Sequence, residues 1–206
     1  MGDKIILAFG AHPDDVEFGC GGTLLLLKEL GYKIKIIDLT RGEKAKRGVN
    51  ERIKEAEKAR KIIGVEREIF NFGDKNVSLS EEHRREIKKI LDNHNPSLVF
   101  APYFVDKHLD HVNTAKLVSE NFNKTIHYFI SNVEKENIGV DITKVYPKKI
   151  KALYAYKTQI KPGDVEWVEE RNKSSGKKLN VKYGELFYIK KELNLPKIFK
   201  KLENVK

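Results

Sequence analysis

The sequence predicts an α/β protein built on a mostly parallel sheet with helices on both faces. Segments with strand character and segments with helix character alternate along residues 4–130, which is the order of a parallel sheet joined by helical crossovers. Two clusters of His and Asp directly follow two of the strand segments. The carboxyl ends of parallel strands share one edge of a sheet, so both clusters are expected at the edge where α/β proteins bind ligands.

Each expected element follows from its own local pattern. Short apolar or β-branched runs predict strands, and apolar residues at helical spacing predict helices. Asn50 and Ser80 are suited to cap helices at their start, and Gly31 and Gly64 are suited to end them. The elements expected in order are strand 4–10, helix 20–30, strand 33–39, helix 51–63, strand 68–72, helix 80–93, strand 97–101, helix 109–121 and strand 126–130.

Beyond Ser131 the alternation weakens. We expect one domain over residues 1–206, with a core at about 4–130 and a C-terminal extension at about 131–206. An apolar content of 40% is enough to build a core at this length. In the extension we expect a strand or short helix at 149–156, a helix at 164–173, a strand at 183–190 and a basic amphipathic tail at 196–206.

Cysteine use and hydropathy indicate the compartment. The chain has a single cysteine, Cys20, which excludes an internal disulfide framework. No apolar run reaches the length of a membrane span, and the first residues lack the apolar region of a secretory signal. We therefore expect a soluble, cytoplasmic protein without a membrane partner.

The positive charge is concentrated in the C-terminal part. The net charge is +10, and residues 148–206 hold 16 Lys and Arg against 7 Asp and Glu. Such a region fits an acidic partner, either a phosphorylated or carboxylated substrate or nucleic acid. A solvated Lys-rich surface is the simpler interpretation. The aromatic interleaving of single-strand binders is not evident, so we do not expect nucleic acid as a partner.

The first cluster offers His12, Asp14 and Asp15 directly after the strand at 4–10. His and carboxylate are common ligands of catalytic zinc, which keeps one position open for water. Adjacent Asp side chains on extended backbone point to opposite sides, so one can bind metal while the other faces the bound water. A carboxylate in that place can act as a general base.

The second cluster offers His108, Asp110 and His111 after the strand at 97–101. The two His residues are three apart, so one helical turn would make them neighbours. One can ligate a metal, and the other can stabilise a developing oxyanion while a carboxylate such as Asp110 holds its tautomer. The residues alone do not say which His has which role.

Neither cluster is decisive alone. His-Pro-Asp-Asp is also a common turn sequence, and a lone His-x-x-His pair is more often a surface feature. Their shared position at strand ends predicts that both surround one divalent metal. The glycine run 19–22 lacks the order of a nucleotide-binding fingerprint, so we expect it to allow close packing of a helix, with Cys20 as a small apolar residue.

Three segments together resemble the PIG-L/LmbE-like family of zinc-dependent de-N-acetylases. They are AHPDDVEFGCGGT at 11–23, LTRGE at 39–43 and HLDH at 108–111. The resemblance covers about residues 4–130. It implies a Rossmann-like sheet, one Zn²⁺ per chain with another divalent metal as the alternative, and a small-molecule amino-sugar substrate. It also raises a homo-oligomer as an option, since members of the family often assemble.

The resemblance also implies roles for individual residues. The zinc ligands would be His12, Asp15 and His111. Asp14 would be the general base and then the acid that protonates the leaving amine. His108, paired with Asp110, would help to stabilise the tetrahedral intermediate.

Three further residues match positions that contact substrate in this family. They are Arg52 at the start of the second long helix, Asp74 in a loop after a strand, and Tyr183 in the C-terminal part. The chain also departs from the family pattern in its basic loop at 44–48, in Gly73 where Pro is familiar, and in Leu109 where Pro is usual.

The function expected from all of this is zinc-dependent removal of acetyl from an N-acetylglucosamine-containing small molecule, either a GlcNAc conjugate or a chito-oligosaccharide. One alternative is a metal-dependent hydrolase of another amide or of a phosphoester, which the basic loop keeps open. Another is a non-catalytic carbohydrate or nucleic-acid binding protein that uses the basic C-terminal region. A binder has no need of Asp14 beside a metal ligand.

Overall fold

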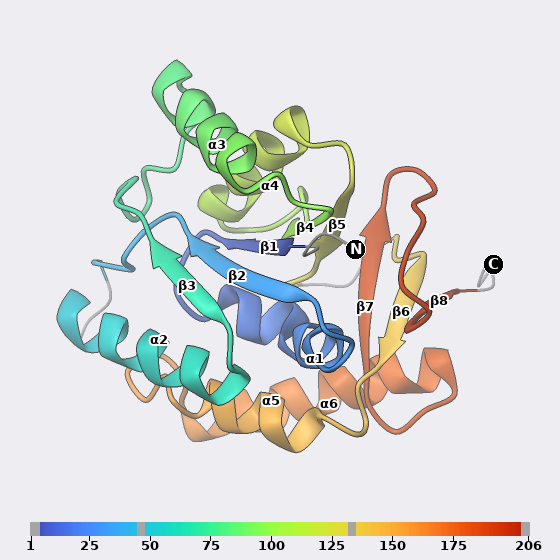
Figure 1. Cartoon of the computed structure of the whole chain (residues 1–206). Coiled ribbons are helices and arrows are strands. Elements are labelled where there is room, and N and C mark those ends of the chain that lie inside the picture. Colours follow the sequence, from blue (N-terminus) through green and yellow to red (C-terminus); the bar gives the residue numbers. More distant parts are fainter. Residues whose placement is uncertain (1–4, 45–47, 132–134, 203–206) are drawn as a thin grey trace.

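The computed structural model describes residues 5–44, 48–131 and 135–202, and most of the basic loop at 44–48 lies outside these ranges. A single sheet of eight strands runs through the molecule (Figure 1). The strands are β1 Ile5–Gly10, β2 Lys33–Asp38, β3 Glu66–Ile69, β4 Leu98–Pro102, β5 Thr125–Tyr128, β6 Ile138–Asp141, β7 Gly184–Ile189 and β8 Phe199–Lys201. The helices are α1 Asp15–Glu29, α2 Val49–Ile63, α3 Glu81–His94, α4 Leu109–Asn121, α5 Tyr146–Leu153 and α6 Pro162–Leu179.

The sheet is mixed and mostly parallel, as the alternating pattern predicts. Its order is β3-β2-β1-β4-β5-β7-β6-β8. The strands from β1 to β5 pair in parallel, whereas β7 and then β6 and β8 add antiparallel pairs. Helices α3 and α4 lie on one face, and α1, α2, α5 and α6 lie on the other (Figure 1). The architecture is Rossmann-like, and the C-terminal extension continues the same sheet.

Local sequence patterns predicted most helices and strands correctly, but they misplaced a few boundaries. Helix α1 begins at Asp15, five residues before the predicted start, because the turn residue Asp14 is its N-cap. Helix α2 is capped by Gly48, so Asn50 lies inside its first turn and the predicted cap was wrong. Ser80 does cap α3, and its side chain accepts a hydrogen bond from the N–H of His83.

The extension differs more from its prediction. In the ambiguous segment at 149–156, residues 149–153 belong to helix α5, and residues 154–156 follow its end. Strand β6 was not predicted, because four residues with a central glycine carry little strand signal. Part of the expected basic tail forms the short strand β8, and residues 203–206 lie outside the described ranges. No helix of the described ranges combines the length and apolarity needed to cross a bilayer.

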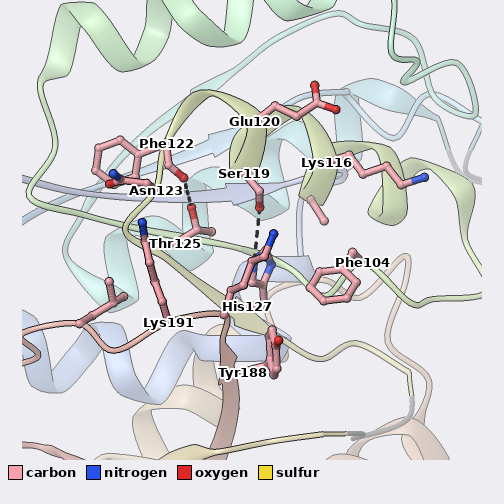
Figure 2. Close-up of a pocket in the computed structure, with 13 residues that line it drawn as sticks. Phe104, Lys116, Ser119, Glu120, Phe122, Asn123, Thr125, His127, Tyr188 and Lys191 are labelled. Carbon is pink, nitrogen blue, oxygen red and sulfur yellow. Dashed lines mark hydrogen bonds between the residues drawn. The ribbon is translucent and has the colours of Figure 1, made fainter.

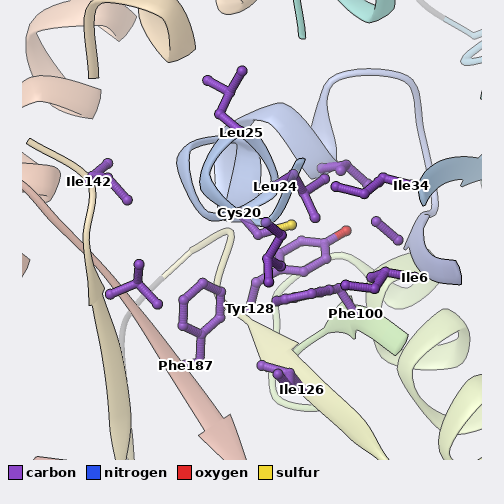
Figure 3. Close-up of a cluster of buried hydrophobic side chains, with 14 of the residues drawn as sticks. Ile6, Cys20, Leu24, Leu25, Ile34, Phe100, Ile126, Tyr128, Ile142 and Phe187 are labelled. Carbon is purple, nitrogen blue, oxygen red and sulfur yellow. The ribbon is translucent and has the colours of Figure 1, made fainter. Parts of the chain in front are cut away.

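Glycines let α1 approach the sheet closely. A Cβ on Gly19 would lie 2.0 Å from a ring carbon of Tyr128, and one on Gly22 would lie 2.9 Å from Ile142. Cys20 is fully buried in the apolar cluster between α1 and the sheet, as predicted (Figure 3). The Tyr128 hydroxyl donates to the carbonyl of Phe9 at 2.7 Å. This packing fixes the start of α1 against the carboxyl ends of β1 and β5.

Candidate metal centre

The first cluster lies where β1 passes into α1. The backbone N–H of His12 donates to Asp15 Oδ2 at 2.9 Å, which folds the turn onto the first residue of the helix. Asp14 is the N-cap, with a strained φ of 117° that non-glycine residues rarely adopt. The side chain of Asp15 is 7% exposed, whereas that of Asp14 is 19% exposed. The two adjacent carboxylates therefore differ in their access to solvent.

The second cluster meets the first across the edge of the sheet. His108 is the N-cap of α4, and His111 lies in its first turn. The ring of His12 lies 4.8 Å from that of His108 and 5.5 Å from that of His111, between centroids. His111 Nε2 lies 3.4 Å from Asp15 Oδ1. Residues about a hundred positions apart in the sequence thus form one group.

Asp106, which the sequence analysis left without a role, orients His111. Its Oδ1 accepts a hydrogen bond from His111 Nδ1 at 3.1 Å and one from the backbone N–H of His108 at 2.8 Å. With Nδ1 bound to Asp106, Nε2 is the ring nitrogen of His111 that faces Asp15. Carboxylates that fix the tautomer of a ligating His in this way are a regular part of metal sites. Only its place in the same loop as the second cluster points to Asp106 in the sequence.

Two more carboxylates converge on His12. Its Nε2 lies 3.2 Å from Asp74 Oδ1, which comes from the loop after β3, and 3.2 Å from Asp110 Oδ2. Backbone N–H groups of neighbouring loops hold both acids: Lys44 donates to Asp74 at 3.0 Å, and Lys75 donates to Asp110 at 2.7 Å. The Asp110 carboxylate faces His12, and its link to His108 runs through the backbone N–H of Asp110.

The electrostatics of this group favour a bound cation. Burial opposes a charged imidazole, but hydrogen bonds to Asp110, Asp15 and Asp74 outweigh it and raise the pKa of His12 to about 12. Burial likewise opposes charging of His111, and nearby carboxylates, led by Asp15, raise its pKa to about 9. The carboxylates therefore hold positive charge at this point even in a buried setting. The same carboxylates would stabilise a bound divalent cation.

The distances also fit a metal. Two sets of side chains offer ligand atoms within 4.8 Å of one another: His12, His108 and His111, and His12, Asp74, His108 and Asp110. Asp15 and His111 are 3.4 Å apart at their nearest atoms. Two ligands of one tetrahedral zinc, with bonds near 2.1 Å, are separated by about 3.4 Å. The residues present therefore fit a metal at the carboxyl edge of β1 and β4.

A match to a protein family agrees with this geometry. Residues 7–122 match the PIG-L family, described as GlcNAc-PI de-N-acetylase, and this span is more than half of the chain. The chain belongs to the PIG-L family. Its His/Asp group offers the ligand types of a metal site.

Several relatives of this PIG-L protein extend the comparison. It is 35% identical over 116 residues to "Uncharacterized deacetylase YaiS" of Escherichia coli, a match that covers 53% of this chain and 63% of YaiS, so less than two thirds of that relative. The crystal structure of the conserved protein TT1542 from Thermus thermophilus superposes with a TM-score of 0.86 at 30% identity, covering 96% and 99% of the two chains. The N,N'-diacetylchitobiose deacetylase of Pyrococcus horikoshii superposes with a TM-score of 0.82 at 26% identity, covering 90% and 83%.

Arg52 of this PIG-L protein holds in place the loop that carries His12 and Asp14. It is 7% exposed, and its guanidinium donates to the carbonyl of Pro13 at 2.8 Å and to Asp14 Oδ1 at 2.8 Å. A third bond reaches Gln159 at 2.9 Å. Burial raises the pKa of Asp14, the charge of Arg52 opposes that effect, and the result is about 6. The contacts of Arg52 are thus with the protein's own loop.

Tyr183 lies apart from the group. Its ring stacks on Tyr146 at 3.7 Å between centroids, and its hydroxyl donates to Glu169 at 3.1 Å. None of these partners belongs to the group around His12. The neighbouring Glu185 has a different task that the sequence analysis missed: its carboxylate accepts hydrogen bonds from the N–H of Gly22 and Thr23, and from Lys149 Nζ, and so ties the extension to α1.

A large cavity lies elsewhere. It has a volume of about 850 Å³ and is formed by the end of α4, β5 and the segment after β7 (Figure 2). The buried His127 at its floor has both ring nitrogens engaged, Nδ1 with the carbonyl of Pro102 and Nε2 with the Ser119 hydroxyl. No member of the group around His12 lines it. Size alone therefore does not identify the functional site of this protein.

Proposed function

We propose that this PIG-L protein removes the acetyl group from an N-acetylglucosamine-containing small molecule and that it uses one Zn²⁺ per chain. The observation that carries the proposal is the convergence of His12, Asp15 and His111 at a buried, carboxylate-rich sheet edge. The similarity to a diacetylchitobiose deacetylase over 90% of the chain supports an amino-sugar substrate.

The proposed ligands are His12, Asp15 and His111. When bound, zinc would supply Lewis acidity, polarising the acetamido carbonyl and lowering the pKa of the attacking water. His111 is prepared for this role because Asp106 binds its Nδ1, which leaves Nε2 free to ligate. Asp110, 3.2 Å from His12 Nε2, keeps the His12 ring in place.

Asp14 is the proposed general base. It follows the loop that carries His12 and precedes Asp15, and its side chain is more exposed than that of Asp15. It can therefore take a proton from water at the edge of the site and return it to the departing amine. The guanidinium of Arg52 holds one of its oxygens at 2.8 Å and leaves the other for the reaction.

His108 is the proposed donor to the oxyanion. Its Nδ1 accepts the backbone N–H of Asp110 at 3.3 Å. A neutral His108 therefore carries its proton on Nε2, where it can donate to a developing negative charge. Burial and the charges of His12 and His111 lower the pKa of His108, which favours the neutral ring.

The substrate contacts follow from position. Asp74 lies at the edge beside His12 and can accept hydrogen bonds from sugar hydroxyls. Arg52 would act on substrate binding through Asp14, which it holds in place. Tyr183 would have to exchange its bond with Glu169 for one with the substrate.

The test is acetate release from a panel of substrates by the zinc-loaded protein: free GlcNAc, N,N'-diacetylchitobiose, GlcNAc-malate, GlcNAc-inositol and a phosphodiester. The variant Asp14→Asn should keep its zinc and lose about a hundredfold to ten-thousandfold in rate, as expected for a general base. Asp92→Asn, an exposed Asp paired with Lys88 on α3, is the matched control and should keep full activity. Unchanged deacetylation by zinc-loaded Asp14→Asn would refute the role of Asp14, and cleavage of the phosphodiester alone would refute the substrate class.

A further inference from the structure

A second cavity lies beside the metal edge and is used by none of the proposed chemistry. Its volume is about 380 Å³, within the range of about 300–1,000 Å³ typical of small-molecule sites. Helix α6 forms one wall, and Ser131, three residues beyond the end of β5, forms another. Its lining includes Ser131, Trp167, Glu170, Arg171 and Ser174.

Two contacts join this cavity to the metal group. The Ser131 hydroxyl donates to Asp106 Oδ2 at 2.7 Å, and the other oxygen of Asp106 binds His111. One carboxylate therefore separates the cavity wall from a proposed zinc ligand. On the other side, Phe18, in the first turn of α1 with Asp15, stacks on Trp167 at 5.1 Å between centroids with an interplanar angle of 16°.

The side chain of Trp167 is packed against neighbouring residues and is still partly exposed to solvent. Phe18 covers one face of the indole, and the side chain is 45% exposed, an unusual value for the largest apolar side chain. The guanidinium of Arg171 lies 5.5 Å from the indole and 4.9 Å from the Phe18 ring. Arg171 is itself fixed by the carbonyls of Phe129 and Ile130. The exposed part of the indole is thus presented on a preorganised support.

The polar groups around the indole suit a sugar. A pyranose ring has an apolar face of C–H groups and a rim of hydroxyls, so it packs on an aromatic face while its rim seeks hydrogen bonds. The exposed side chains of Glu170 and Ser174 line the same cavity as Trp167. A carboxylate and a hydroxyl can accept and donate to such a rim. An aromatic platform next to short polar side chains is therefore matched to a carbohydrate rather than to an acyl chain.

We propose that this cavity binds the sugar ring next to the acetylated one, stacked on Trp167. The inference rests on the proposed deacetylase function and names its substrate class: N-acetylglucosamine joined to a second pyranose, as in a chito-oligosaccharide. The deacetylated ring would occupy the edge near His12, and the next ring would extend toward α6.

Fluorescence tests the subsite without catalysis. Trp167 is the only tryptophan of the chain, so the intrinsic emission reports on this cavity directly. Titration of the zinc-depleted wild-type chain with N,N'-diacetylchitobiose should shift and quench the emission with saturation. Free GlcNAc at the same concentrations should change it much less. An emission that does not respond to the disaccharide would overturn the proposal.

Kinetics test the same subsite in the zinc-loaded chain. Trp167→Ala should raise KM for diacetylchitobiose about tenfold, the effect of about 1.4 kcal/mol that an aromatic contact supplies. KM for free GlcNAc should stay the same, and Trp167→Phe should recover part of the loss. Tyr154→Ala removes another exposed aromatic, at the end of α5 and 53% exposed, and serves as the control with wild-type constants.

The outcomes separate the two proposals. Equal loss on the disaccharide and on free GlcNAc would refute the subsite while leaving the deacetylase function intact. If the wild-type chain releases acetate from no substrate, the deacetylase function fails, and the fluorescence titration still decides whether a disaccharide binds. If Trp167→Ala does not fold, Trp167→Phe and the wild-type titration carry the test.

Discussion

Two buried groups of charged side chains flank the start of α1, and they balance their charges in different ways. In the first, Glu17 and Asp38 surround Arg67, and all three side chains are at most 2% exposed. Arg67 Nη1 lies 2.8 Å from Glu17 Oε1, and the Tyr156 hydroxyl donates to the same carboxylate. Arg67 Nε lies 3.0 Å from Asp38, although the alignment makes no hydrogen bond.

The second group is the metal edge. Carboxylates surround two imidazoles there, and the nearby guanidinium of Arg52 is already bound to Pro13 and Asp14. The first group contains a permanently charged Arg, whereas the second offers only His, which is also a metal ligand. Buried acids paired with an Arg of the chain therefore stabilise the fold, whereas buried acids around His form a group suited to binding an external cation.

The largest effect should come from removing the internal cation. Arg67→Met leaves two acids buried without a cationic partner, so the free energy of unfolding should fall by about 3–5 kcal/mol. Urea unfolding measures this loss, and the zinc content of the folded fraction should stay the same. Lys144→Met, which breaks an exposed pair with Glu29, is the control and should cost about 0–1 kcal/mol. A small loss for Arg67→Met would contradict the structural assignment of this group.

Loss of a proposed ligand should lower zinc binding while the zinc-free chain still folds. His111→Ala should weaken zinc binding by more than about a hundredfold, the upper end of what an outer-shell change costs. Zinc content after dialysis and acetate release are the measurements. His94→Ala, at the end of α3, is a matched His substitution and should change neither. Full zinc content in His111→Ala would remove it from the ligand set.

Removing the metal should change the melting temperature through the second group and not through the first. Zinc at a hundredfold excess over its dissociation constant should stabilise the folded chain by about 2.7 kcal/mol, and a chelator should lower the Tm accordingly. Arg67→Lys should keep this zinc-dependent shift, and His111→Ala should lose it. Calorimetry with and without a chelator measures the zinc-dependent shift of the Tm. Equal shifts in both variants would show that the two groups do not differ in their response to the metal.

The effect that is smallest per pH unit concerns the titration of Asp38. Burial, opposed by the charge of Arg67, raises the pKa of Asp38 to about 7, so between about pH 4 and 7 the folded chain binds the proton that the unfolded chain has lost. Stability from this group therefore falls as pH rises, by at most about 1.4 kcal/mol per pH unit. Asp38→Asn should remove that slope, as measured by urea unfolding at pH 5, 6 and 7. An unchanged slope in the variant would show that Arg67 keeps Asp38 ionised.

Sequence patterns predicted much of this molecule. The alternation over residues 4–130 predicted the parallel strands and the placement of both clusters at one edge, because a strand followed by a helix fixes its own direction and end. The helix at 109–121 matches α4 to the residue. The antiparallel strands β6 and β8 escaped prediction, since they are short and depend on pairing with neighbouring strands rather than on a pattern of their own.

The sequence by itself determined which reactive side chains are present and where they lie along the chain. They form two His/Asp motifs, each at the end of a strand. Tertiary structure alone decided the partners. It placed Asp106 behind His111, turned Asp110 toward His12, bound Arg52 to the metal loop and put Trp167 against Phe18. The physical reason is range: strand and helix signals are local along the chain, whereas these contacts join segments that only the folded sheet brings together.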